Sequence, residues 1–261
     1  MGEMLAVDAV NFFEATVGQD WLKEHLKLIK AGQGGGVAFG RGIETSLNVP
    51  AVAYYWYKAR EEIAFSEITG ENKCGSNSLL TAAIGRDLQL LKQAAGLPVL
   101  LQGLKGLAEP FLVLGQLSLA SGYAGENYQI TFKAGFATAA KAEKQINYVV
   151  ISANGVNKKL TESLVANKQV IYIIVGDTGH EGKKRWADWS PPRPLSQMAA
   201  EHNLLLVVCG LWFEQINNRP VFIRTGRLVE GYNSNSPDSL VYIPNEKISI
   251  NKAGALLIEN K

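Results

Sequence analysis

The sequence has few cysteines, no long apolar run and no marked excess of charge of either sign. Its two cysteines, Cys74 and Cys209, lack the spacing of a zinc site or a disulfide framework, so we expect two unrelated reduced thiols. No window reaches the roughly 18–20 apolar residues that cross a bilayer. The nearest, residues 111–123, contains polar side chains and predicts a buried helix. With no cationic, apolar signal segment at the N-terminus, we expect a cytoplasmic protein without a membrane partner.

The balance of charge excludes little else. A net charge of +2 and a pI near 8.4 give no strong overall field, although a local basic patch for nucleic acid remains compatible with them. Over 261 residues, 47% are hydrophobic and 19% are charged, as is typical of folded globular chains. We therefore expect a chain that folds, in one compact unit.

The first half of the chain predicts helices. Apolar residues recur at helical spacing, and glycines or prolines bound the segments. The expected helices span residues 7–31 (one amphipathic helix, or two if it is broken near Gly18), 50–69, 79–95, 98–107 and 110–121. Residues 34–42 form a glycine-dense loop.

From Tyr128 onward, short β-branched runs replace the helical period. The expected strands are residues 129–132, 148–151, 170–175, 204–208 and 221–223, with a smaller edge strand near 241–243. Helical segments are predicted between them at 137–145, 158–167 and 195–202. This order predicts an α/β fold: an N-terminal helical region, residues 1–125, packed on a sheet core, residues 126–261. We expect a mixed, largely parallel sheet of about five to six strands, with helices on both faces.

Ligands of open α/β sheets bind beyond the carboxyl ends of the strands, which directs attention to two loops. The first is residues 152–155, where Asn154 follows a strand and precedes a helix. Small residues there expose backbone N–H groups to an anion, but a tight turn needs the same residues for structural reasons.

The second loop, residues 176–185, is the richest cluster of charge in the chain. Its carboxylates and histidine suggest catalysis: Asp177 as base or metal ligand, His180 as proton shuttle, and Glu181 as a second carboxylate. Its three cations suit a phosphate group, so substrate binding is assigned to Lys183, Lys184 and Arg185 together with Asn154. The alternative is a solvated surface loop. Residues 186–194, rich in tryptophan and proline, form either a lid over the strand ends or a cover for the sheet edge.

The segment order also resembles the restriction-endonuclease-like PD-(D/E)XK superfamily. The likeness covers residues 48–243 and rests on the segments 54–62, 86–91 and 111–132. It implies a helix before a mixed sheet that carries carboxylates and a lysine, with Mg²⁺ as the cofactor and a nucleic acid or nucleotide as the partner.

The chain departs from that family's motif. No acid stands two residues before Lys133, and the segment 114–117 lacks the expected helix glutamate. Glu181-Gly182-Lys183 matches Glu-x-Lys, with Asp177 four residues earlier, but in a loop rather than on two strands.

Two functions follow from these patterns. The first is a nuclease-like, metal-dependent enzyme that acts on a phosphate-bearing substrate through the loop 177–185. The second is a non-catalytic binding or assembly protein with a degenerate nuclease-like core, for which a homo-oligomer is one form.

Overall fold

The architecture is taken from a computed structural model, which describes residues 4–32, 49–70, 74–106, 110–155, 168–176, 181–229 and 241–260. The glycine-dense loop 34–42 and the helix expected at 158–167 lie outside these residues.

The N-terminal half is helical, as predicted. The break near Gly18 is present, because Gly18 has a φ of 103° and separates two helices. The helices are α1 (Ala6–Val17), α2 (Gln19–Gly32), α3 (Ala51–Thr69), α4 (Ser76–Leu90), α5 (Leu97–Leu104) and α6 (Pro110–Gly125). Helix α4 ends five residues before the predicted boundary at Ala95, since residues 94 and 95 turn toward the sheet edge, where the Ala95 N–H donates to the Ile130 carbonyl.

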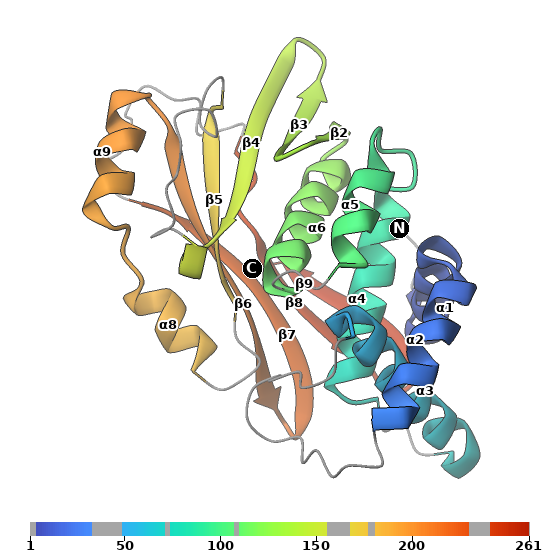
Figure 1. The fold of residues 1–261 in the computed structure, drawn as a ribbon. Coiled ribbons are helices and arrows are strands. Elements are labelled where there is room, and N and C mark those ends of the chain that lie inside the picture. Colours follow the sequence, from blue (N-terminus) through green and yellow to red (C-terminus); the bar gives the residue numbers. More distant parts are fainter. Residues whose placement is uncertain are drawn as a thin grey trace.

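The described strands form one nine-stranded sheet (Figure 1). Its order is β1-β9-β8-β7-β6-β5-β4-β3-β2. The strands are β1 (Met4–Leu5), β2 (Gln129–Lys133), β3 (Phe136–Lys141), β4 (Lys144–Ser152), β5 (Val170–Gly176), β6 (Leu205–Ile216), β7 (Arg219–Leu228), β8 (Asn245–Ile250) and β9 (Ala255–Asn260).

The prediction of an α/β fold with a mixed sheet is confirmed, but the predicted size and the parallel character were wrong. The sheet has nine strands rather than five or six, and only β4–β5 and β5–β6 are parallel among its described pairs. The other pairs are antiparallel. Antiparallel neighbours need only a tight turn between them, and such turns occur at residues 134–135, 142–143 and 217–218.

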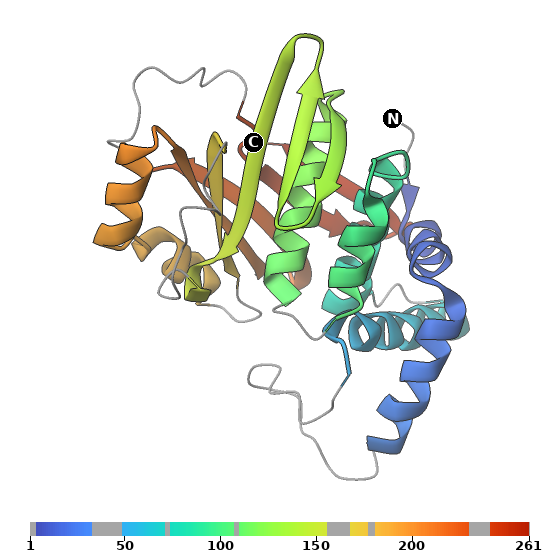
Figure 2. The same cartoon turned by 45° about the horizontal axis from the view of Figure 1, so that its top comes forward.

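Two segments account for most of the error. The segment 137–145, expected as a helix, forms β3 and the start of β4, so β2, β3 and β4 make an antiparallel meander beside α5 and α6 (Figure 2). The segment 241–243, expected as an edge strand, is not one, and the C-terminal hairpin is β8–β9 instead.

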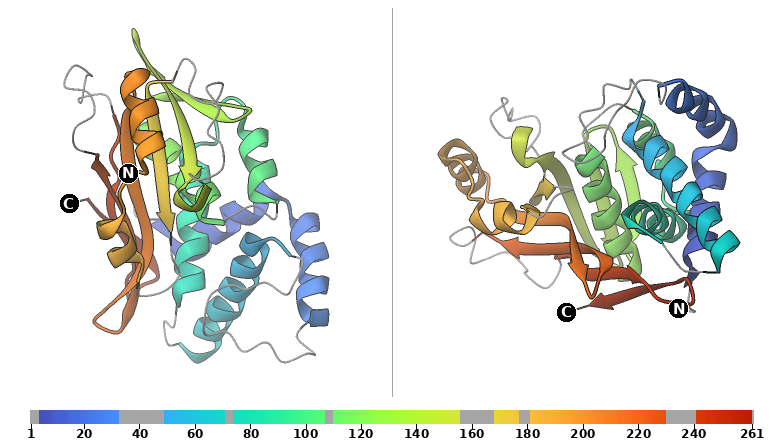
Figure 3. Two further views of the ribbon diagram at one scale, coloured as in Figure 1. Left: turned by 60° about the vertical axis from the view of Figure 1, so that its left-hand side comes forward. Right: turned by 90° about the horizontal axis from the view of Figure 1, so that it is seen from below.

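Helices cover both faces of the sheet, as predicted. One face packs against α1–α6 around a large core that includes Phe13, Leu88 and Leu117. The other face packs against α9 (Arg193–Glu201), close to the predicted helix 195–202, and against α8 (Gly182–Asp188). Figure 3 shows these two helices across the sheet from the N-terminal group. No helix among the described residues is long and apolar enough to cross a membrane.

A buried set of four charges joins the helices to the sheet; we call it the Arg224 network, made of Arg224, Asp87, Glu246 and Arg86. Arg224 on β7 donates two hydrogen bonds to Asp87 on α4, with Nη1–Oδ1 of 3.0 Å and Nη2–Oδ2 of 2.6 Å. Glu246 on β8 accepts from Arg224 at 3.3 Å and from Arg86 at 3.3 Å. Burial opposes the charge of Arg224, but the two carboxylates outweigh it and raise its pKa. The network is balanced in charge, and all of its members except the partly exposed Arg86 are buried.

Candidate functional site

A pocket of about 530 Å³ lies where the parallel strands β4 and β5 end. Its size falls in the range of about 300–1,000 Å³ that is usual for small-molecule sites. Its lining comes from three parts of the chain that are distant in sequence: the first turn of α6, the ends of β4 and β5, and helix α8 with the residue that follows it. These elements are labelled in Figure 1. Its lining residues are Pro110, Phe111, Leu112, Ser152, Ala153, Asn154, Ile174, Val175, Gly176, Arg185, Asp188 and Trp189. We call it the strand-end pocket.

Two glycines allow α6 to approach β5 closely at this end. A Cβ on Gly176 would lie 2.2 Å from Cγ of Phe111, and a Cβ on Gly115 would lie 2.5 Å from Cδ1 of Ile174. Atoms do not pack at such distances, so larger residues at either position would push the helix away from the strand. The glycines therefore place the first turn of α6 at the pocket wall.

The first turn of a helix brings uncompensated N–H groups, because its amides have no acceptor within the helix. Pro110 has no N–H and suits the first helical position. Phe111 and Leu112, which follow it, line the pocket. With the positive end of the helix dipole, this wall favours an anion.

Helix α8 supplies the polar groups on the opposite side. Arg185 and Asp188 lie three residues apart on α8 and both line the pocket. Trp189, immediately after the helix, adds an aromatic ring, and its carbonyl accepts a hydrogen bond of 2.5 Å from Nη2 of Arg227 on β7. This bond ties the end of α8 to the sheet.

The β4 side is a short polar turn. Ser152 ends β4, and the turn η1 (Ala153–Gly155) follows it. The backbone N–H of Asn154 donates to Oγ of Ser152 at 3.3 Å, and the Asn154 side chain is exposed. A hydroxyl and an amide thus face the same space as Arg185.

The structure brings together two of the residues predicted to bind substrate. Asn154 and Arg185 line the same pocket at the carboxyl ends of two parallel strands. Lys183 and Lys184 lie exposed on α8 and do not line it; Nζ of Lys183 is 3.6 Å from Oε1 of Glu214 on β6. Of the residues predicted to be catalytic, Glu181 is exposed before α8 and is not part of the pocket wall. Asp177 and His180 lie outside the described residues.

No group of three or more potential metal-binding side chains occurs within the described part of the chain. Among the described residues that line the strand-end pocket, Asp188 is the one carboxylate. Asp188 alone is too few oxygen ligands for a divalent cation, which takes six or more, some of them from water or substrate.

Sequence reasoning missed Phe111 and Leu112 as pocket residues, and it named Asp188 and Trp189 only as part of the segment 186–194. The segment 186–194 was expected either over the strand ends or over the sheet edge, and Trp189 lies at the strand ends. Trp189 lines the pocket, whereas Nε1 of Trp186 donates to the Val208 carbonyl on β6 at 3.2 Å. The helix start at Pro110 was predicted, but its place at the strand ends depends on tertiary packing.

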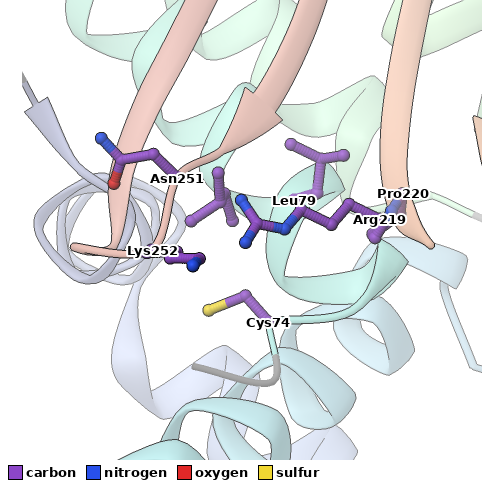
Figure 4. Close-up of a pocket in the computed structure, with 7 residues that line it drawn as sticks. Cys74, Leu79, Arg219, Pro220, Asn251 and Lys252 are labelled. Carbon is purple, nitrogen blue, oxygen red and sulfur yellow. The ribbon is translucent and has the colours of Figure 1, made fainter. Parts of the chain in front are cut away.

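A second, smaller cavity of about 50 Å³ adjoins Cys74. Figure 4 shows the side chains of Arg219 and Lys252 at the same cavity. A reactive thiol has a lowered pKa. Here burial raises the pKa of Cys74, the carboxylate of Glu62 raises it further, and a hydrogen bond with Ser78 only partly offsets them. Cys74 therefore lacks the lowered pKa of a nucleophilic cysteine.

Comparison with known protein families, curated proteins and solved structures finds no match to this chain. Its function must be argued from the geometry of the site.

Proposed function

We propose that this protein binds a nucleotide-sized, phosphate-bearing ligand in the strand-end pocket. The observation that carries the proposal is that Arg185 and the first turn of α6 line one pocket at the end of two parallel strands. A guanidinium offers a planar fork of donors to phosphate oxygens, and helix N-terminal amides add neutral donors to the same anion.

The rest of the wall suits a nucleoside attached to the phosphate. Trp189 provides a ring for stacking with a base, and Phe111 and Leu112 provide apolar surface. Ser152 and Asn154 offer a hydroxyl and an amide for a ribose. A pocket of about 530 Å³ with two aromatic side chains and one lining arginine suits a single nucleotide better than a long nucleic acid, which needs an extended basic groove.

The reaction proposed with this ligand is metal-dependent hydrolysis of the phosphate group. Asp188, the one carboxylate among the described lining residues, would hold a Mg²⁺ ion only together with water and the ligand itself, and the ion would supply charge neutralisation at the phosphate. Asp177 and His180 remain the sequence-based proposals for the acid–base groups, whereas Glu181, the third residue proposed from the sequence, does not line the pocket.

The decisive test is titration calorimetry with ADP in the presence of Mg²⁺. Removal of one hydrogen-bonding partner of a charged group costs about 1.5–3 kcal/mol, so Arg185→Ala should weaken ADP binding by roughly 10- to 150-fold. Lys184→Ala removes the adjacent cation, which lies outside the pocket wall, and should leave the affinity unchanged. Equal loss in both variants would reject the pocket and indicate a diffuse charge effect.

Two further experiments test the contribution of the base and the proposed hydrolysis separately. Trp189→Ala should weaken ADP but not inorganic pyrophosphate, since only the nucleotide has a base to stack. Release of phosphate from ADP or ATP with Mg²⁺, lost in Asp188→Asn, would support hydrolysis. Binding without any turnover would support the non-catalytic alternative.

A further inference from the structure

Helix α8 forms one wall of the strand-end pocket but is too short to hold its own place. It has seven residues, and isolated helices shorter than about 12–15 residues are marginal in water. Its N-cap, Glu181, makes no side-chain capping bond. The helix lies beside β5 and β6 (Figure 1). The position of this wall must therefore come from its contacts with the sheet.

Trp186 is the residue through which α8 meets the sheet. Its Nε1–H donates to the Val208 carbonyl, and its ring centroid lies 5.8 Å from that of Trp212, both on β6. Gly210 lies between these two residues on the same face of the strand. A Cβ at Gly210 would be 2.8 Å from Cγ of Trp186, so the glycine leaves the space that the indole occupies.

Arg227 on β7 contacts α8 at two points. It is the cross-strand partner of Val208. Its Cζ lies 5.7 Å from the ring centroid of Trp186, within the range of about 6 Å for a cation–π contact. Its Nη2 donates to the Trp189 carbonyl at 2.5 Å. One guanidinium thus holds the chain on both sides of Asp188.

These anchors set the direction of the pocket side chains. Arg185 and Asp188 lie three residues apart, on one side of α8, and Trp186 is rotated by about 100° from Arg185. A movement that separates Trp186 from β6 also moves Arg185 and Asp188. Arg227 is not among the described lining residues of the pocket, so its influence on a ligand there passes through α8.

We propose that Arg227 is a positioning residue of the strand-end pocket. It fixes α8 to the sheet, and so directs Arg185 toward the phosphate and Trp189 toward the base of the ligand. This role rests on the nucleotide proposed for the pocket. The placement of α8 does not, and it can be measured in the free protein.

The first experiment follows hydrogen exchange of the Trp186 indole N–H by NMR in the free, full-length chain. Arg227→Met keeps an unbranched apolar stem and removes the guanidinium. Exchange should become about tenfold faster, because a hydrogen bond from a charged donor no longer holds α8 closed. The indole N–H of Trp56 donates to Glu14 among the N-terminal helices, and its exchange should not change. Unchanged exchange at Trp186 would overturn the proposal.

The second experiment is calorimetric titration of the same variants with ADP and Mg²⁺. Arg227→Met should weaken binding about tenfold. Arg193→Met is the matched control, since it removes an exposed arginine of α9 that is not among the described lining residues. Its ADP affinity and Trp186 exchange should equal those of the unaltered protein. Equal losses in the two variants would overturn the proposal in favour of a general effect of charge.

Two further variants separate position from charge. Gly210→Ala displaces Trp186 without a change of charge, and it should speed the exchange and weaken ADP. Arg227→Lys keeps a cation and a donor, so it should recover part of both changes. Thermal melts check that each variant is folded. A loss of ADP affinity in Arg227→Met without faster Trp186 exchange would overturn the positioning role.

The two proposals for the pocket fail in different ways. Absence of ADP binding by the unaltered protein would reject the nucleotide. The exchange rates of Trp186 and Trp56 would still decide whether Arg227 fixes α8 to the sheet.

Discussion

Charged and polar side chains gather in two regions of this molecule, the Arg224 network and the strand-end pocket. In the network, Arg224 is 2% exposed and Asp87 is fully buried, and each pairs with the other at hydrogen-bond distance. In the pocket, Arg185 and Asp188 are exposed on α8 and line a space large enough for a ligand. The buried charge cluster therefore stabilises the fold, whereas the exposed one lines the pocket where we propose that a ligand binds. Four changes, ordered by expected effect, test this difference.

The largest effect should come from Arg224→Ala. It leaves the two buried carboxylates, Asp87 and Glu246, with Arg86 as the one cation remaining in the network, and breaking a buried ion pair costs about 3–5 kcal/mol. Urea unfolding should show that loss, while Arg219→Ala, an exposed arginine on the same strand, should change little. A loss below about 1 kcal/mol for Arg224→Ala would mean that the network does not hold α4 to the sheet.

Gly176→Ala should have the next largest effect, because it should lower both the stability of the fold and the affinity for ADP. Its Cβ would meet Phe111 at 2.2 Å, so either α6 or β5 must shift, at about 1–3 kcal/mol of stability. ADP affinity should fall as well, since the first turn of α6 moves from the pocket wall. Gly103→Ala on α5 is the control: no atom lies within 4 Å of its Cβ, and alanine favours helix. Unchanged ADP binding in Gly176→Ala would argue against a role for the helix terminus.

Glu14→Gln should lower stability by about 1 kcal/mol, the usual net value of a hydrogen bond that is lost or weakened. Glu14 on α1 accepts from Nε1 of Trp56 at 2.6 Å and from Nε of Arg60, both on α3. Burial raises the pKa of Glu14, but these two bonds outweigh it and lower the pKa below 4.5. Its contribution is therefore present above that pH and disappears as the pH falls through the lowered value.

Chemical denaturation between pH 3 and pH 7 measures this contribution. The difference between Glu14→Gln and the unaltered protein should be constant near neutrality and should shrink in acid. A difference that grows as the pH falls would contradict the assignment of the lowered pKa.

Lys183→Ala should have the smallest effect. Its ion pair with Glu214 spans 3.6 Å, and the lysine side chain is 70% exposed, so the pair contributes at most a few tenths of a kcal/mol. Melting temperature and ADP affinity should both be unchanged. A clear drop in ADP affinity would place the ligand farther along α8 than Arg185.

Much of the fold was predictable because the helices have clear apolar periodicity and glycine or proline boundaries. Gly18 and Pro110 mark a break and a start that the structure retains. The main error fell on β3, where Ala137, Ala139 and Ala140 read as helix formers. In the structure these small residues belong to a strand of the antiparallel meander, and Ala137 and Ala139 are buried there. Reading that segment as a helix also led to the prediction of a largely parallel sheet.

The candidate site was predictable only in part. The general rule for strand ends identified the loops of Asn154 and Arg185, which line one pocket. The rule could not identify Phe111, which lies more than forty residues earlier and reaches the pocket through the close approach at Gly176. The Arg224 network was likewise hidden, since Asp87 and Glu246 are 159 positions apart in the sequence.

The most direct test of the central claim is a ¹H–¹⁵N NMR titration of the full chain with ADP and Mg²⁺. The account predicts that amides from every wall, including Phe111, Asn154, Gly176 and Arg185, shift together and saturate at one affinity, while that of Asp87 in the Arg224 network stays in place. Saturable shifts confined to another part of the molecule, or no shifts at the strand ends, would contradict it.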